Sequence, residues 1–241
     1  MPSVVAIVLA AGRGVRLGAR RPKAEVEVAG RSLLAWSLDA LARAPSVDAV
    51  LPVVGSEGSP TLEPLLRAGA APFEGAELLA PVEGGEERQD SVERGIAAAQ
   101  RACPDLEWVL VHDAARCGIR SEDAESVLRA AYETGAAIPV VPVSDTIKEL
   151  EGGRVVRTPD RAALGAAQTP QAFRASTLAC ALAKARQDGF SGTDCASLVE
   201  RIGVPVVACA GFAHGFKVTT ADDLARMRAL LEARWGGGTG S

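Results

Sequence analysis

The chain of 241 residues is 48% hydrophobic and 4% aromatic, so it has enough apolar side chain for a substantial core and too much for a disordered protein. Its formal net charge of -4 argues against general binding to nucleic acids or to anionic membranes. No apolar stretch approaches the roughly 20 residues that span a bilayer, and the first apolar run has no leader-like segment before it. A cytoplasmic location is therefore expected. The five cysteines form no C-x-x-C pair, which disfavours a disulfide framework or a zinc site.

Strands and helices are predicted to alternate from the start of the chain. A buried strand over 4–9 precedes a helix that begins at Ser32, its N-cap, and ends near 43. The next elements expected in order are a strand over 47–54, the start of a helix at Ser59-Pro60, a weak strand over 76–80, a helix over 89–102, a strand over 108–111, a helix over 121–134 and an apolar run over 136–143. This alternation predicts a mainly parallel sheet covered on both faces, with ligands at the carboxyl ends of its strands.

The alternation stops at residues 144–159, which read SDTIKELEGGRVVRTP. Two short β-type runs around Gly152-Gly153 predict a hairpin arm that extends from the body. Beyond it we expect a helix over 175–187, a second over 194–201, a strand over 205–209 and a closing helix from Thr220 to about Trp235 that starts with a Thr220/Asp223 capping box. The chain is thus interpreted as a single domain over 1–232, which includes the arm, followed by a disordered glycine-rich tail over 233–241.

The segment LAAGRGVRLG over 9–18 has the composition of a phosphate-binding loop. Gly12 and Gly14 leave backbone N–H groups open to an anion, and Arg16 and Lys23 supply positive charge. The spacing is not that of a Walker A loop, and it misses the dinucleotide fingerprint by one residue. The alternative is a glycine-rich strand-to-helix turn with no nucleotide role.

A second informative segment, VHDAAR over 111–116, follows the strand predicted at 108–111. Asp113 is placed to point into the site and to hold Mg²⁺ directly or through water, since phosphates and water supply most of the ligands of this ion. His112 is expected to pack as a structural residue because no second histidine lies at ligand spacing.

Seven sequence blocks occur in one order along the chain. They read LAAGRGVRLG followed by PK, GGEERQDSV (84–92), VHDAAR, SDTIK (144–148), AAQTPQAF (166–173), GTDCASLVE (192–200) and FKVTTADDL (216–224). The ordered set resembles the 2-C-methyl-D-erythritol 4-phosphate cytidylyltransferase family from Val4 to about Arg228. The resemblance implies a Rossmann-like, GT-A-like nucleotidyltransferase domain with three α/β/α layers, a mainly parallel mixed sheet and a protruding β-hairpin arm.

The activity that the resemblance implies belongs to the non-mevalonate isoprenoid pathway. The 4-phosphate of 2-C-methyl-D-erythritol 4-phosphate attacks the α-phosphorus of CTP and releases pyrophosphate, with Mg²⁺ as the implied cofactor. The attacking phosphate is already ionised near neutral pH, so no general base is needed. Such an enzyme must align two anions and stabilise the charge of the transition state, which calls for cations.

The resemblance also assigns roles to individual positions. The expected catalytic residues are four cations: Arg16 and Lys23 match positions that contact the triphosphate and stabilise the transition state, and Arg161 and Lys217 match positions that place the acceptor for attack. Asp113 is the expected metal residue. The nucleotide-binding positions are Ala10, Ala11, Gly12, Gly84, Gly85, Glu86 and Ser91, and the substrate-binding positions are Arg116, Thr146, Thr169 and Thr193. In this family the arm crosses to a second subunit, which implies a homodimer in which Thr146 and Arg161 complete the partner's site.

Several of these positions have a structural alternative. The alternatives are solvated surface charge for Arg16 and Lys23, a helix N-cap for Ser91, an exposed loop charge for Glu86, a snorkelling lysine for Lys217 and a helix cap for Thr193. The chain also departs from the usual family pattern at Ala24, Cys117, Cys195 and Gly215, where glutamine, proline, an acidic residue and asparagine are more common. None of these departures removes a proposed phosphate contact.

Two rival functions remain open. Ribitol 5-phosphate cytidylyltransferases share the architecture and most nucleotide motifs, although VHDAAR and AAQTPQAF favour methylerythritol phosphate. A nucleotide-binding regulator that has lost catalysis would keep the glycines and discard the acceptor cations. The joint presence of Arg16, Lys23, Arg161 and Lys217 argues against it.

Overall fold

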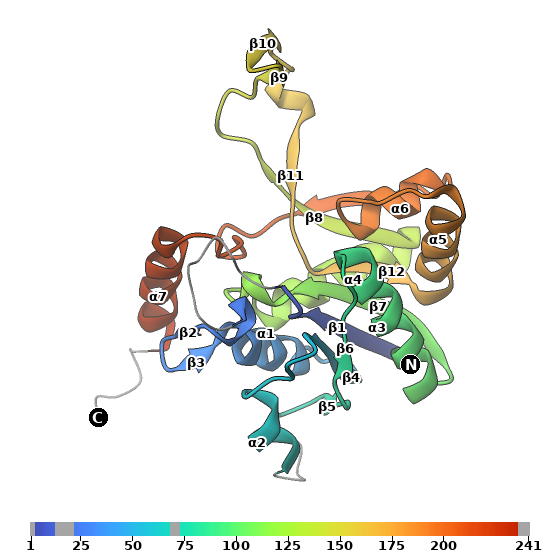
Figure 1. Ribbon diagram of the computed structural model, residues 1–241, viewed down its shortest axis with the longest axis vertical. Helices are drawn as coiled ribbons and strands as arrows, with labels where there is room; N and C mark the ends of the chain where they lie inside the picture. Colours follow the sequence, from blue (N-terminus) through green and yellow to red (C-terminus); the bar gives the residue numbers. More distant parts are fainter. Residues whose placement is uncertain (1–2, 13–21, 68–72, 236–241) are drawn as a thin grey trace.

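A nine-stranded mixed sheet forms the centre of the computed structural model, which describes residues 3–12, 22–67 and 73–235 (Figure 1). The main path of the sheet is β11-β8-β12-β7-β1-β4-β5, with β13 beside β8 and β6 beside β4. These strands are β1 (Ser3–Leu9), β4 (Ala49–Val54), β5 (Glu77–Leu78), β6 (Val82–Glu83), β7 (Leu106–Asp113), β8 (Ala136–Pro142), β11 (Gly165–Ala167), β12 (Gln171–Arg174) and β13 (Val207–Ala210). β1 pairs in parallel with both β4 and β7, as the alternating pattern predicts.

Helices cover both faces of the sheet. α1 (Leu33–Ala42) and α4 (Ser121–Thr134) pack on one face, and α3 (Arg88–Ala102), α5 (Ala175–Asp188) and α6 (Cys195–Arg201) pack on the other. Alternate residues of β1 enter the two cores, since successive side chains of a strand point to opposite faces. The predicted three-layer α/β/α architecture is confirmed.

A smaller cluster joins the end of the chain to its beginning. α7 (Ala221–Trp235) contributes Met227 and Leu231, which pack with Val28 and Trp36 of the β2 (Glu27–Val28), β3 (Arg31–Ser32) and α1 region. The α7 helix begins with the predicted capping box. It continues through Trp235, so the tail predicted from 233 starts with three helical residues; residues 236–241 lie outside the described chain.

Local sequence signals explain most of the element boundaries. Ser32 caps α1 by accepting a hydrogen bond from the Ala35 N–H at 3.0 Å, as predicted. The short α2 (Leu62–Arg67) follows the Ser59-Pro60 start signal. Gly135 ends α4 with a φ of 93°, a left-handed conformation that favours glycine.

The antiparallel strand β12 was not predicted. It lies between β7 and β8 and pairs antiparallel with both, which makes the sheet mixed. Its first three residues are buried, and a run of four residues has too little alternation to be told apart from a loop. The short ribbon of β2 and β3 escaped prediction for the same reason.

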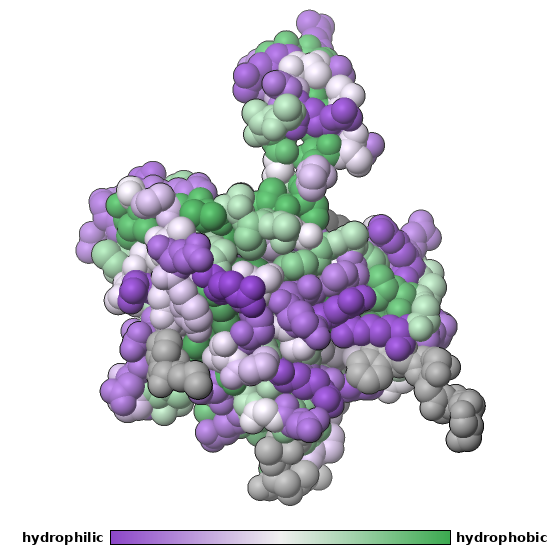
Figure 2. Space-filling model, turned by 180° about the vertical axis from the view of Figure 1, so that it is seen from behind, coloured by the Kyte–Doolittle hydropathy of each residue, from purple (hydrophilic) through white to green (hydrophobic). Residues whose placement is uncertain are grey.

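The arm, residues 144–159, contains the hairpin of β9 (Glu149–Glu151) and β10 (Arg154–Arg157), as predicted (Figure 1). Gly152 and Gly153 form the turn, with φ values of 54° and 82°. Apolar side chains lie exposed on the hairpin, and Figure 2 shows hydrophobic surface on the arm and at its base. In the described part of the chain, every helix is too short or too polar to cross a bilayer.

Candidate active site

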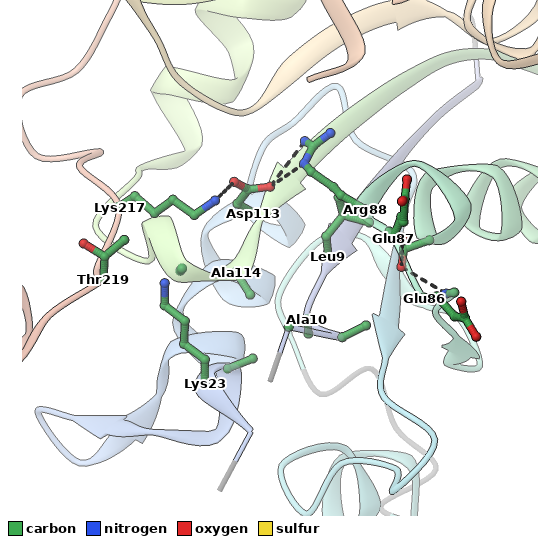
Figure 3. Close-up of a pocket in the computed structure, with 16 residues that line it drawn as sticks. Leu9, Ala10, Lys23, Glu86, Glu87, Arg88, Asp113, Ala114, Lys217 and Thr219 are labelled. Carbon is green, nitrogen blue, oxygen red and sulfur yellow. Dashed lines mark hydrogen bonds and ion pairs between the residues drawn. The ribbon is translucent and has the colours of Figure 1, made fainter. Parts of the chain in front are cut away.

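A pocket of about 420 Å³ lies at the carboxyl ends of β1 and β7 (Figure 3). Its lining comes from five parts of the chain: Leu9 to Gly12, Lys23 and Ala24, Gly85 to Arg88 with Ser91, Asp113 to Ala115, and Lys217 with Thr219. The position at the carboxyl edge of parallel strands is the one predicted for the ligand site.

Asp113 joins three of these parts through ion pairs. Its Oδ2 lies 2.7 Å from Lys217 Nζ, and its Oδ1 lies 3.3 Å from both Nε and Nη2 of Arg88. Burial opposes ionisation of this carboxyl, but the two cations outweigh that effect and hold its pKa well below the usual range. Asp113, Lys217 and Arg88, called here the Asp113 cluster, therefore present a charged wall to the pocket (Figure 3).

Arg88 is the site residue that the sequence analysis missed. It is the first residue of α3, and its guanidinium spans from Asp113 to Cys195, with Nη1 3.5 Å from the Cys195 Sγ. The GGEERQDSV block contains Arg88, but sequence order does not reveal that this helix start faces the end of β7. The one available signal was a basic residue just before the helix predicted over 89–102, within a block that the resemblance assigns to the nucleotide site.

Most of the expected nucleotide positions line the same pocket. Ala10, Ala11, Gly12, Gly85, Glu86 and Ser91 all line the pocket. Gly84 lies behind them, where an added Cβ would stand 2.6 Å from the Ala11 Cβ and 2.7 Å from the Ser91 Oγ. The close approach of two chain segments therefore requires glycine at this position.

Ser91 and Lys23 have defined places in the pocket. Ser91 lies inside α3, which starts at Arg88, so the alternative of a helix N-cap is wrong; its hydroxyl accepts a hydrogen bond from the Gly85 N–H at 3.1 Å. Lys23 is half-buried and points into the pocket (Figure 3). Arg16, its predicted companion at the triphosphate, lies outside the described residues.

Thr169 and Arg116 are not among the residues that line this pocket. The Thr169 hydroxyl accepts a hydrogen bond from the Asp113 N–H at 3.1 Å and lies 3.0 Å from His112 Nδ1. Burial lowers the pKa of His112 to about 3, so this histidine is neutral, as expected for a packed structural residue. Arg116 donates to the carbonyl oxygens of Gly215 at 3.0 Å and Ala167 at 3.3 Å, which ties together two segments of the site.

Thr146, Arg161 and Thr193 do not line this pocket. Arg161 lines a second cavity at the base of the arm and donates to the Ser144 carbonyl oxygen at 2.7 Å. Thr193 is exposed and does not cap α6, because Asp194 accepts the Ser197 N–H at 2.9 Å. The acceptor roles of all three residues stay predictions.

The departures from the family pattern have ordinary environments. Cys117 and Cys195 are buried, and Ala24 lies at the pocket with little exposure. The carbonyl of Gly215 is an acceptor for Arg116. Cys180 is exposed, Cys103 and Cys209 are half-buried, and all five cysteines are free thiols.

An α/β/α domain with a glycine-lined, cation-rich pocket at the carboxyl edge of its parallel strands is typical of nucleotide-binding enzymes, the class to which nucleotidyltransferases belong. The family model for 2-C-methyl-D-erythritol 4-phosphate cytidylyltransferase matches residues 4–233. The chain belongs to this family.

Individual relatives agree with this assignment. A protein of Saccharopolyspora erythraea with the family's name is 46% identical over 231 residues, covering 95% of this chain and 99% of the relative. The bifunctional enzyme IspD/IspF of Rhodopseudomonas palustris is 41% identical over 98% of this chain, which spans 57% of that relative's length. The crystal structure of the cytidylyltransferase from Thermus thermophilus is 36% identical with a TM-score of 0.75, covering 94% of this chain and 98% of the other.

Proposed function

We propose that this protein transfers the cytidylyl group of CTP to 2-C-methyl-D-erythritol 4-phosphate, giving 4-diphosphocytidyl-2-C-methyl-D-erythritol and pyrophosphate. Family membership over residues 4–233 supports this activity. The observation on the site that carries most weight is the pairing of Lys217 with Asp113 beside a glycine-lined pocket. That arrangement serves two phosphate-bearing ligands better than it serves one neutral ligand.

The chemistry follows from the positions of the charges. The attacking phosphate oxygen forms a bond to the α-phosphorus, and the bond between this phosphorus and the bridging oxygen to the β-phosphate breaks. Lys23 and Lys217 reach the pocket from different segments, so they can neutralise two anions that would otherwise repel each other. The pocket backbone at Ala11 and Gly12 can lie close to the nucleotide because no large side chain intervenes.

Mg²⁺ is part of this proposal. Asp113 is ionised and lines the pocket, so its oxygens suit a hard cation. Its two oxygens already contact Lys217 and Arg88, which favours a Mg²⁺ ion that takes most of its ligands from phosphates and water. When bound, the ion would neutralise negative charge on the phosphates.

A homodimer through the arm is also proposed. Leu150 is 62% exposed and Val155 60% exposed, and Arg161 lines the cavity at the arm's base rather than the pocket. An apolar hairpin of this kind fits a second copy of the chain, whose pocket would receive Thr146 and Arg161. A cytoplasmic location likewise stays a prediction.

Pyrophosphate release tests the proposed function. The purified protein is incubated with CTP and Mg²⁺ and with 2-C-methyl-D-erythritol 4-phosphate, ribitol 5-phosphate or no acceptor. We expect release with methylerythritol phosphate and background release in the other two reactions. A preference for ribitol 5-phosphate would overturn the proposed identity of the acceptor. Background release in all three reactions would favour a non-catalytic nucleotide-binding protein.

A further inference from the structure

Glu25 is a buried carboxylate two residues after Lys23. It ends the short 3-10 turn η2 (Lys23–Glu25) and is 7% exposed. The pocket lining includes Lys23 and Ala24 but not Glu25. Glu25 thus faces away from the ligand site, into the protein, although it belongs to the same turn as a predicted catalytic lysine.

Three donors from one loop surround this carboxylate. The Ser59 hydroxyl donates to Oε1 at 2.5 Å, and Thr61 donates to Oε2 through its hydroxyl at 2.5 Å and its N–H at 3.1 Å. Buried carboxylates are costly without such partners, and hydrogen bonds to a charged acceptor are stronger than neutral ones. Glu25 is therefore a firm attachment point between η2 and the loop that follows β4.

The attachment extends to two helices. Ser59 Oγ also accepts the Leu62 N–H at the start of α2 at 3.3 Å, and the Thr61 and Ser32 hydroxyl oxygens lie 2.8 Å apart. Ser32 is the N-cap of α1. The carboxylate of Glu25 consequently ties the turn that carries Lys23 to the starts of both α1 and α2.

Backbone hydrogen bonds also connect the turn to its surroundings. The Lys23 N–H donates to the Gly12 carbonyl at 3.4 Å, and the Val26 N–H donates to the Lys23 carbonyl at 3.2 Å. A lysine side chain is long and flexible, so the position of its ammonium group depends on where its backbone is fixed. A displacement of about 1 Å at a catalytic group can cost on the order of 100-fold in rate.

We propose that Glu25 is a positioning residue for Lys23: by anchoring η2 to Ser59 and Thr61, it sets where the Lys23 ammonium enters the pocket. This inference rests on the proposed function, in which Lys23 contacts the triphosphate. Glu25 does not touch the ligand and exchanges no proton with it.

A double-mutant cycle tests the inference. Glu25→Gln keeps the shape of the side chain but removes its negative charge and replaces one acceptor oxygen with an NH₂ donor, so the donors of Ser59 and Thr61 lose one of their two acceptor atoms. We expect kcat/KM for CTP to fall roughly 10-fold to 100-fold, chiefly through kcat. In a Lys23→Ala background the same change should lower kcat/KM by less than about threefold, because two residues that act as one unit are not additive.

The matched control is Glu27→Gln, an exposed glutamate two residues further on, which should keep wild-type kinetics. If Glu25→Gln is too unstable to purify folded, Thr61→Val removes one donor, retains the carboxylate and should give a smaller loss of the same kind. The positioning role would be overturned if folded Glu25→Gln kept wild-type kinetics. It would also be overturned if the double variant lost kcat/KM by the product of the two single losses. In either case, turnover by the wild-type protein would still support the proposed function. A wild-type protein without turnover would overturn both.

Discussion

The Asp113 cluster and the arm are built in opposite ways. In the cluster, Asp113 contacts Lys217 and Arg88 from distant parts of the same chain, and the carboxylate is buried. At the base of the arm, Arg161 contacts the Ser144 carbonyl, and the apolar side chains of the hairpin are exposed. One chain thus completes the charged wall of its pocket, whereas in the proposed dimer the arm would bring Thr146 and Arg161 to the pocket of a second copy.

The surroundings of the two regions explain this contrast. Asp113 ends β7, a strand paired on both sides by β1 and β12. The segment that carries Lys217 is fixed by a hydrogen bond of 2.8 Å from the Val218 N–H to the Ala115 carbonyl and by a contact of 2.6 Å between His214 and Asp123. The β9–β10 hairpin pairs with itself as a separate two-stranded sheet.

The largest effect is expected from Asp113→Asn. The amide cannot neutralise Lys217 and Arg88, so an exposed and a half-buried cation would lie close together without the buried anion that they share. We expect kcat/KM to fall by about 100-fold to 1,000-fold in the pyrophosphate-release assay. Asp105→Asn, which changes an exposed carboxylate directly before β7, serves as the control. Activity within about threefold of wild type would show that the cluster is not the functional wall of the pocket.

The sequence predicted the features of the site that depend on local patterns and missed those that depend on contacts between distant residues. The strand ending in Asp113 and the glycine-lined loop were predicted, because buried runs and glycines are local signals. The partnership of Arg88 with Asp113 joins residues 25 positions apart in different elements, and the internal position of Thr169 depends on the unpredicted strand β12 that follows it. Tertiary packing decides such contacts, and no local pattern encodes them.

A complementation experiment tests whether the arm acts on the partner. Arg161→Ala should lower kcat/KM for the acceptor by about 10-fold to 100-fold and leave the KM for CTP nearly unchanged. If Arg161 serves the partner's pocket, mixed dimers of Arg161→Ala and Lys217→Ala contain one site with both defects and one intact site. A 1:1 mixture that exchanges subunits should then recover about one quarter of wild-type activity, since half of the dimers are mixed.

A mixture of the two variants that recovers no activity would contradict the proposal that Arg161 serves the partner's pocket. That result would place Arg161 and Lys217 in the same chain's site, where every combination retains one defect. Arg157→Ala is the matched control on the arm, because its guanidinium pairs with Glu149 on the hairpin itself. It should leave acceptor kinetics unchanged.

A smaller effect concerns the neutral histidine beside Asp113. The pKa of His112 is about 3 in the folded protein because the residue is buried, and near 6.5 in the unfolded chain. Between these two pKa values the unfolded state binds more protons than the folded state. The contribution of His112 to the free energy of unfolding is therefore fully present above about pH 6.5 and is lost as the pH decreases toward 3. From pH 7 to pH 5 the loss from this group is about 2 kcal/mol.

Urea unfolding of His112→Asn at both pH values measures this contribution. The variant should be less stable than wild type at pH 7 but should lose about 2 kcal/mol less between pH 7 and pH 5. The chain has two histidines, and His214 is common to both proteins, so the difference in slope reports His112. Equal slopes would mean that the end of β7 does not hold a neutral imidazole.

The smallest effect on folding is expected on the arm. Leu150→Ser and Val155→Ser change side chains that are 62% and 60% exposed, so the free energy of unfolding of a single chain should change by less than about 0.5 kcal/mol. Self-association should weaken instead, which light scattering over a dilution series measures. An oligomer unchanged by both substitutions would remove the arm from the interface. A monomer that keeps full activity would be a stronger contradiction, because it would show that the pocket around Asp113 is complete in one chain and that activity does not need Arg161 from a partner.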